Sequence, residues 1–254
     1  MKNRSEITEG LKSLLEKNDK VIAVWEGGSA ATGFLDDHSD LDLAVVCEDD
    51  AVEDVFFEIE SHLESVYGIE EKFRMPEPAW HGFSQCFYKT GNVPELFYFD
   101  IAVIKRSNPN KFTETDRHGE AVIWFEKEKM VVPSVTPEEE IISKGKKLFH
   151  MATDTLFLTE IELKKALARR NFTEAFHQYF LIIYRTLGIL LNLKYRPCKS
   201  DFGLRYADRD YEKHDAEFLD GLFKVTSTEE LREKSDKVLL RISELREELE
   251  TKWK

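Results

Sequence analysis

Apolar residues follow two different spacings along the chain, and the spacing changes near residue 137. Before that point, short apolar runs rich in β-branched side chains predict buried strands, because such side chains pack well on a pleated sheet. Strands are expected at 21–25, 41–46 and 96–104, with weaker candidates at 83–88 and 121–125. Helical spacing of apolar residues predicts two helices, at 5–18 with Ser5 as its cap, and at 51–66.

A helix start marks the change of spacing. Thr136, Pro137 and Glu139 supply a capping hydroxyl, a proline for the first helical position and a glutamate for the third. From there the pattern predicts one helix over 138–169, or two helices broken at about 153–155.

Two more amphipathic helices are expected downstream, at 172–194 and 228–251. The chain is therefore predicted to be an α+β protein. A small mixed-sheet domain over residues 1–136 would be followed by an all-α helical bundle over 137–254.

The composition sets limits on the class of protein. Of 254 residues, 42% are hydrophobic, which is enough for a substantial core, and 18 Phe, 8 Tyr and 4 Trp argue against disorder. No apolar run approaches the roughly 20 residues of a membrane span, and the N-terminus lacks an apolar signal core, so we expect neither insertion nor secretion. The cysteines are far apart and form no CxxC pair, which predicts reduced thiols in a cytoplasmic protein: Cys47, Cys86 and Cys198.

Charge is distributed unevenly between the two halves. Residues 1–136 hold 14 basic and 27 acidic residues, whereas residues 137–254 hold 22 of each. The first half is therefore expected to handle cations, either metal ions or a cationic substrate, with a solvated acidic face as the alternative. Double-stranded nucleic acid is not expected as a partner, because phosphates would be repelled.

Three aspartates are the main candidates for chemistry. Asp40 and Asp42 stand two positions apart at the start of a predicted strand, so both side chains point to one face. Asp100 lies inside another apolar strand, where a charge is costly unless it is paired or binds metal. If the two strands are neighbours, the three carboxylates form a cluster that could hold one or two Mg²⁺ ions for an in-line attack on a nucleoside triphosphate.

A glycine turn precedes this pair of aspartates. Gly28 lets the backbone approach a phosphate closely, and the Ser29 hydroxyl and N–H can donate to its oxygens. The combination is more specific than its parts: a strand, a GS turn, about ten residues, a DxD entering a strand, and an acid within a later strand.

With these motifs the sequence resembles the nucleotidyltransferase superfamily of the polymerase-beta-like fold. The resemblance covers roughly residues 20–105. The matching positions are Gly28, Ser29, Asp40, Asp42 and Asp100. It implies transfer of a nucleoside monophosphate from a triphosphate to a hydroxyl, with Mg²⁺.

The helical half resembles the C-terminal bundle of nucleotidyltransferases that modify aminoglycosides and lincosamides. The segment Tyr195-Arg196-Pro197-Cys198-Lys199 is similar to a recurring tyrosine–proline–lysine element there. The resemblance implies that Lys199 helps to hold the phosphates, and it makes a homodimer compatible with the chain. Further cationic candidates are Lys146, Arg185 and Arg205.

The chain departs from the family pattern near the turn. Many members carry a basic residue shortly after the GS pair, whereas this chain has Ala30-Ala31-Thr32, and Glu26 adds a negative charge just before it. Phosphate binding is therefore expected to rely on backbone donors, metal and the helical half.

The predicted activity is that of an Mg²⁺-dependent nucleotidyltransferase acting on a small hydroxylated molecule, such as an aminoglycoside-like antibiotic. Asp40 and Asp42 would bind metal, Asp100 would bind metal or take the acceptor proton, and Gly28, Ser29 and Lys199 would bind the nucleotide. Two alternatives remain open: a nucleotide-binding module without turnover, and an enzyme of the same fold that adenylylates a partner protein.

Aromatic residues in the irregular stretch 67–93 supply one more candidate site. Trp80 and Phe83 could line a pocket for the base or the acceptor, with filling of the core as the alternative. His38, beside the acidic residues of the DxD loop, is expected at the surface.

Overall fold

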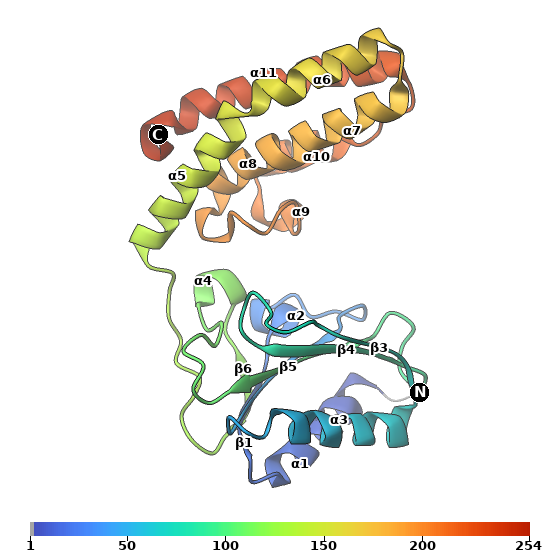
Figure 1. Ribbon diagram of the computed structural model, residues 1–254, viewed down its shortest axis with the longest axis vertical. Coiled ribbons are helices and arrows are strands. Elements are labelled where there is room, and N and C mark those ends of the chain that lie inside the picture. Colours follow the sequence, from blue (N-terminus) through green and yellow to red (C-terminus); the bar gives the residue numbers. More distant parts are fainter. Residues whose placement is uncertain (1–2) are drawn as a thin grey trace. The chain divides into compact units, whose positions relative to one another are not determined.

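The computed structural model describes residues 3–254 and divides the chain into two compact units, Met1–Val135 and Thr136–Lys254 (Figure 1). The first unit combines a mixed β-sheet with helices, and the second consists of helices. Each unit has its own hydrophobic core. The α+β class predicted from the spacing of apolar residues is confirmed.

Within the described residues, the first unit contains a six-stranded sheet in the order β3-β4-β5-β2-β1-β6. The neighbours β2 and β5 are parallel, and the other neighbouring pairs are antiparallel. The strands are β1 (Val21–Glu26), β2 (Leu41–Cys47), β3 (Ile69–Arg74), β4 (Ser84–Thr90), β5 (Phe99–Lys105) and β6 (Val122–Glu126).

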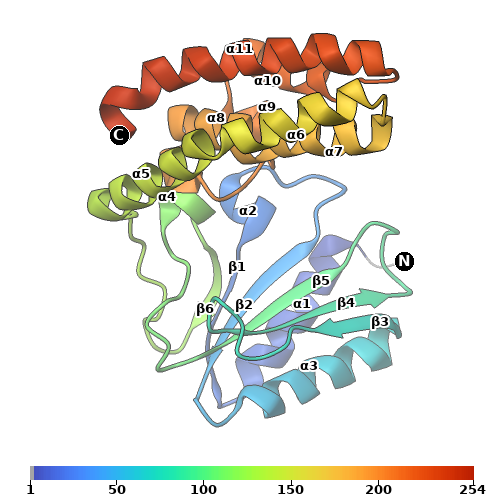
Figure 2. The same cartoon turned by 45° about the horizontal axis from the view of Figure 1, so that its top comes forward.

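Two helices, α1 (Arg4–Lys17) and α3 (Val52–Tyr67), cover one face of this sheet (Figures 1 and 2). Side chains alternate between the two faces along a strand, so one set of β2 residues packs under these helices. Leu41, Leu43 and Val45 belong to this core and are buried.

The opposite face of the sheet is covered only in part. A smaller core forms at one end, in which Trp25 and Phe83 are buried. Nearer the start of β2, Asp42 and Ala44 are only half-buried. Two short helices adjoin this face, α2 (Gly28–Thr32) and α4 (Thr115–His118).

The second unit is built around the long helix α11 (Thr228–Trp253). Its predicted apolar stripe is buried: Leu231, Val238, Ile242, Leu245 and Leu249. The other helical segments of this unit are α5 (Glu138–Asp154), α6 (Leu156–Ala168), α7 (Phe172–Ile182), a π-helical segment (Ile183–Leu187), α8 (Gly188–Tyr195), a 3-10 helix (Pro197–Lys199), α9 (Ala207–Asp210) and α10 (Lys213–Leu222). Across residues 3–254, no helix combines the length and apolarity needed to cross a membrane.

Two predicted helix caps are wrong. Asn3, and not Ser5, caps α1: its side chain accepts the Glu6 N–H (3.0 Å), and the Glu6 carboxylate accepts the Asn3 N–H. At α5 the cap position belongs to Pro137, which has no side-chain acceptor to offer, so Thr136 does not cap the helix. Both errors displace a helix start by a residue or two, as expected of sequence patterns.

The break inside 138–169 is present, because α5 ends before Thr155 and α6 begins after it. The predicted helix at 172–194 runs on from α7 to α8 through the π-helical segment. The strand β3 and the helix α10 were missed, as were the short helices α2, α4 and α9 and the 3-10 helix. The strand β3 has mostly exposed, charged residues at the sheet edge, so no apolar run marks it.

Helix α5 packs on the end of α11 through a glycine. A Cβ at Gly145 would lie 2.2 Å from Cζ3 of Trp253, a ring that is 0% exposed and therefore has little room to move. At Gly221 in α10, a Cβ would meet none of the described atoms within 4 Å.

We expect Gly145→Ala to lower the free energy of unfolding by about 1–3 kcal/mol, the usual cost of overpacking a core. Gly221→Ala, the matched control, should raise it by about 0.5–1 kcal/mol, because alanine favours the helix and restricts the unfolded chain. Urea denaturation followed by circular dichroism measures both values. Equal effects of the two substitutions would contradict the packing of Gly145 on Trp253.

Candidate active site

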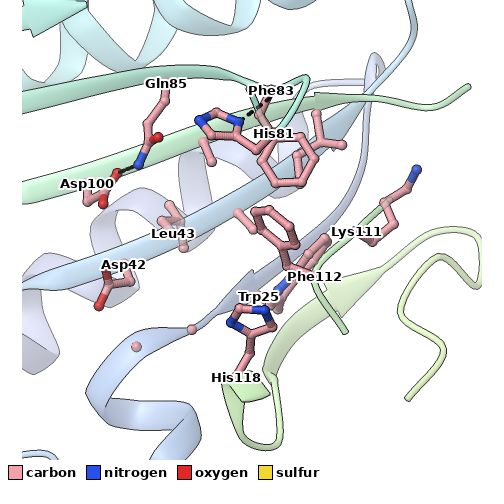
Figure 3. A pocket seen from close by; sticks show the side chains of 15 residues that line it. Trp25, Asp42, Leu43, His81, Phe83, Gln85, Asp100, Lys111, Phe112 and His118 are labelled. Carbon is pink, nitrogen blue, oxygen red and sulfur yellow. Dashed lines mark hydrogen bonds between the residues drawn. The ribbon is translucent and has the colours of Figure 1, made fainter. Parts of the chain in front are cut away.

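Two aspartates lie side by side on the parallel strands β2 and β5. The register pairs Asp42 with Asp100, and the alternation of side chains puts both on the half-open face of the sheet. Asp40 directly precedes β2. Figure 3 shows Asp42 and Asp100 at one end of a pocket. The two strands are therefore neighbours, which was the condition for a three-carboxylate cluster.

The close approach of these carboxylates changes their acidity. Burial, together with the charges of Asp40, Asp100 and Glu26, raises the pKa of Asp42 to about 7. Burial also raises the pKa of Asp100 to about 6, although a hydrogen bond from Gln85 works against this shift. In that bond, Gln85 Nε2 donates to Asp100 Oδ1 (2.6 Å). Like charges held together away from water resist simultaneous ionisation, and a cation between them would relieve the repulsion.

The three aspartates do not form a ready-made metal cage. Among residues 3–254, no group of three or more His, Cys, Asp or Glu side chains is arranged to hold a metal ion. Asp40, Asp42 and Asp100 are near enough to affect one another electrostatically, but they do not converge on one point as the side chains stand. Asp42 and Asp100 nevertheless offer adjacent, half-buried oxygen donors, the type that Mg²⁺ prefers.

The glycine turn packs directly against the Asp42 side chain. Gly27 N–H donates to the Asp42 carbonyl oxygen (2.8 Å). Gly28 has φ +52°, and a Cβ there would lie 1.6 Å from Asp42 Oδ2, so only glycine fits. The next residue, Ser29, has a buried Oγ without a hydrogen-bond partner in the part of the chain that the structure describes. A glycine backbone without a side chain, at Gly28, and the unpaired Ser29 hydroxyl therefore lie beside the carboxylates.

Glu26, the negative charge just before the glycine turn, has a cationic partner inside the fold. It is 6% exposed and forms an ion pair with Arg4 of α1. Trp25 lines the pocket, so the next side chain along β1 points to the opposite face, where α1 lies. Arg4 Nη1 also donates to the Asp40 carbonyl oxygen (2.7 Å), which ties the DxD loop to α1.

Neither Arg4 nor Gln85 was identified from the sequence. A glutamate at the end of a buried strand does call for a cation, which was the available signal for Arg4. Gln85 is a polar residue within the predicted strand at 83–88, where side chains alternate between two faces, and this was the available signal for it. In both cases the partner is set by tertiary structure, 22 positions away for Arg4 and 15 for Gln85.

Aromatic rings form the other end of the pocket: Trp25, His81, Phe83, Phe112 and His118 (Figure 3). Of the two aromatic candidates from the sequence, Phe83 lies in this wall and also belongs to the smaller core. Trp80 is 84% exposed, with its ring centroid 6.0 Å from that of Phe112. The predicted surface position of His38 is confirmed, since it is exposed.

Comparison with known families agrees with this geometry. Residues 9–93, about a third of the chain, match the family model described as polymerase beta, nucleotidyltransferase. The first unit contains a nucleotidyltransferase domain. The matched segment includes the GS turn and the DxD pair and ends before Asp100, and it does not reach the helical unit. No curated protein matches the chain in sequence.

The cationic residues predicted to assist the nucleotidyltransferase domain lie in the second unit. Lys199 is half-buried in the 3-10 helix, and Arg185 and Arg205 are exposed. The amine of Lys146 donates to the Lys254 carbonyl oxygen (2.8 Å). A role of these residues in phosphate binding stays a prediction.

The raised pKa of Asp42 makes stability depend on pH. The folded-state pKa, about 7, lies above that of an unfolded aspartate, about 3.9, so the folded protein binds the proton more tightly. The stabilisation from protonated Asp42 is fully present below about pH 4 and is lost as pH rises through about 7.

Without metal, we therefore expect Asp42→Asn to be more stable than the parent at pH 8, by about 2–4 kcal/mol, and nearly equal to it at pH 3.5. Urea denaturation at both pH values in the presence of EDTA measures the difference. Asp37→Asn, an exposed aspartate of the same loop, is the control and should show no such trend. A parent protein as stable as Asp42→Asn at pH 8 would contradict the strained carboxylate pair.

Proposed function

We propose that the chain is an Mg²⁺-dependent nucleotidyltransferase that moves a nucleoside monophosphate from a nucleoside triphosphate to a hydroxyl of a small molecule. The proposal rests above all on the register that sets Asp42 beside Asp100, with Gly28 packed on the Asp42 carboxylate. In a nucleotidyltransferase domain, this arrangement supports a divalent cation next to a backbone turn that a phosphate can approach.

Asp40 and Asp42 would hold the metal, and Asp100 would either add an oxygen to the metal or take the acceptor proton, the role that we assign to it below. Their oxygens suit a hard cation, and the repulsion that raises the pKa of Asp42 would be relieved by one. One or two bound Mg²⁺ ions would supply positive charge to the triphosphate and to the charge that develops in the reaction.

The GS turn would bind the phosphates. Gly28 has no side chain to keep a phosphate away from the backbone, and the Ser29 hydroxyl is the donor that we assign to a phosphate oxygen. Because Ala30, Ala31 and Thr32 carry no charge, the turn offers dipoles alone, and Lys199 is the proposed cationic partner.

We assign Asp100 as the base that takes the proton of the acceptor hydroxyl. The bond from Gln85 occupies Oδ1 and orients the carboxylate, which leaves Oδ2 for the proton. A pKa of about 6 is close to neutral pH, where a general base works best. The acceptor oxygen then bonds to the α-phosphorus while the bond from this phosphorus to the β-phosphate oxygen breaks, and pyrophosphate leaves.

The acceptor in this proposal is a small hydroxylated molecule. The acidic excess in residues 1–136 favours one with cationic groups, such as an aminoglycoside, because complementary potentials attract. A homodimer and a cytoplasmic location stay predictions from the sequence, and ATP is one candidate donor among the nucleoside triphosphates.

A pair of glycine substitutions tests the contact between the turn and the carboxylate. Gly28 (φ +52°) and Gly33 (φ +76°) both have positive φ, so alanine strains either one by about 1 kcal/mol. Only at Gly28 would the new Cβ strike Asp42, since a Cβ at Gly33 meets none of the described atoms within 4 Å.

We expect Gly28→Ala to weaken binding of the Mg²⁺ complex of a non-hydrolysable nucleotide by about 10- to 100-fold, as loss of a supporting contact to a metal ligand does. Gly33→Ala should leave the dissociation constant within about twofold, because it removes no such contact. Calorimetric titration measures both. Equal binding of the complex by the two variants would contradict a role of the Gly28–Asp42 contact in nucleotide binding.

Turnover is tested by pyrophosphate release from each of the four common nucleoside triphosphates. The assay is run with Mg²⁺, with and without aminoglycosides, lincosamides and simple sugar alcohols. Release that requires an acceptor should fall by about 10²–10⁴-fold in Asp100→Asn, the range for loss of a general base. Asp42→Asn should bind no Mg²⁺–nucleotide.

Two results would redirect the proposal. Binding of Mg²⁺–nucleotide without release, with any small or protein acceptor, would favour a nucleotide-binding module. Equal nucleotide binding by the parent and by Asp42→Asn would show that the carboxylates do not serve the reaction at all.

A further inference from the structure

The aromatic end of the pocket forms a separate half of the site, which we call the ring pocket. Its floor is Ala44 and Ala102, which are paired in the register of β2 and β5. Its walls are Trp25, His81, Phe83, Phe112 and His118 (Figure 3). Small residues on the floor and large rings in the walls leave a hollow that side chains of the first unit do not fill.

The wall at Phe112 is held in a strained backbone conformation. Phe112 has φ +53°, a region that costs a bulky residue about 1–3 kcal/mol. The Asn110 side chain accepts the Phe112 N–H (2.9 Å) and helps to hold this conformation. As a result, the Phe112 ring stands 4.8 Å from the ring of Phe83 and 5.1 Å from that of His118, centroid to centroid. Strain of this kind is typical of positions that clamp a ligand.

Two polar groups in the lining are oriented by the backbone. His81 Nδ1 accepts the Phe83 N–H (3.0 Å), so its hydrogen sits on Nε2, and burial lowers the pKa of His81 and favours this neutral form. The amine of Lys111 donates to the carbonyl oxygens of Asn108 and Arg106. His81 thus presents a hydrogen-bond donor to the pocket, whereas the Lys111 amine is held on the backbone and is directed away from the rings (Figure 3).

These groups select against charged ligands inside the ring pocket. The His81 N–H is unfavourable for an ammonium group, and Asp42 and Asp100 at the other end would repel an anion. The walls favour flat apolar surfaces, because aromatic rings gain most from stacking and edge contacts.

Size and spacing limit the ligand further. The whole pocket, with its carboxylate end included, has a volume of ≈ 170 Å³, so the ring pocket has room for one small ring at most. Apolar cavities of about 150 Å³ hold one benzene ring. The alanine pair lies two residues beyond Asp42 and Asp100 along the strands, a rise of about 6.6 Å. If a ring lies on this floor, a group that is attached to the ring directly or through one carbon would therefore reach the edge of the Asp100 carboxylate.

We propose that the ring pocket binds one planar, uncharged ring of a substrate of the transferase reaction. The ring is either the base of the nucleoside triphosphate or a ring of the acceptor that bears its hydroxyl directly or on the next carbon. Charged groups of a larger acceptor would lie outside the ring pocket. The role of the ring in turnover rests on the proposed function, whereas its binding does not.

The test uses ring-containing probes and the full chain. Ligand-observed NMR is recorded with benzyl alcohol, 4-(hydroxymethyl)pyridine and cytidine, and with tetramethylammonium as the cationic comparison. Binding of at least one ring probe in the millimolar range is expected, the usual strength for a fragment of this size. No binding of any ring probe by the parent, or tetramethylammonium as the tightest ligand, would overturn the proposal.

Three variants locate the bound ring. Ala102→Leu places a larger side chain on the floor and should weaken binding of the ring probes by at least about tenfold, because that side chain occupies the space of the ring. Phe112→Gly removes a wall and relieves the positive φ, so it should fold well yet bind at least about fivefold more weakly. Arg170→Gly makes the same backbone change at φ +55° in the helical unit and should bind as the parent does. Equal binding by all three variants would overturn the proposal.

Competition distinguishes the two sources of the ring. If Mg²⁺ with α,β-methylene-ATP displaces the probes while Mg²⁺–tripolyphosphate does not, the ring is the nucleobase. If benzyl alcohol binds alongside the nucleotide, the ring belongs to the acceptor. Either result supports the ring pocket.

The same data separate this inference from the proposed function. Ring probes that bind and respond to Ala102→Leu, in a protein that binds no Mg²⁺–nucleotide, would uphold the ring pocket and refute the transferase. Turnover of nucleotide by a protein that binds no ring probe would uphold the transferase and refute the ring pocket.

Discussion

The parallel pairing of β2 with β5 is the constraint around which the first unit is organised. It sets Asp42 beside Asp100 on a half-buried face, where burial raises the pKa of both carboxyls, helped by the charges of Asp40 and Asp100 at Asp42 and by the charge of Asp40 at Asp100. For Asp42, the difference between a pKa of about 7 in the folded chain and about 3.9 in the unfolded chain corresponds to a free energy on the order of 4 kcal/mol. The buried core under α1 and α3 tolerates this cost, which a bound cation would remove.

Groups from several elements support this pair of carboxylates. Arg4 of α1 neutralises Glu26 on the far face of the sheet and holds the Asp40 carbonyl. Gly28, the first residue of α2, leaves room for the Asp42 carboxylate, and Gln85 of β4 orients Asp100 by a charge-assisted hydrogen bond. The geometry of the site therefore depends on sheet order as much as on the aspartates themselves.

The same two strands change from charged to apolar within two positions. Ala44 and Ala102 follow the aspartates in register, and the strained ring of Phe112 stands over this apolar area. A site built in this way places an electrostatic half and a ring-binding half on one rigid floor. Rigid placement of both halves is what a transfer reaction needs, because a hydroxyl must be held within reach of its base.

The sequence by itself determined the element types, the α+β class and the residues of the GS turn and DxD pair, because periodic apolar spacing and turn residues act locally. It missed β3, whose charged edge carries no apolar signal, and it placed the caps of α1 and α5 wrongly. Only the tertiary structure decided that Asp100 lies opposite Asp42, that Arg4 neutralises Glu26, and that Phe112 and His81 line the pocket. Each of these contacts joins distant segments through strand order and packing, which no local spacing encodes.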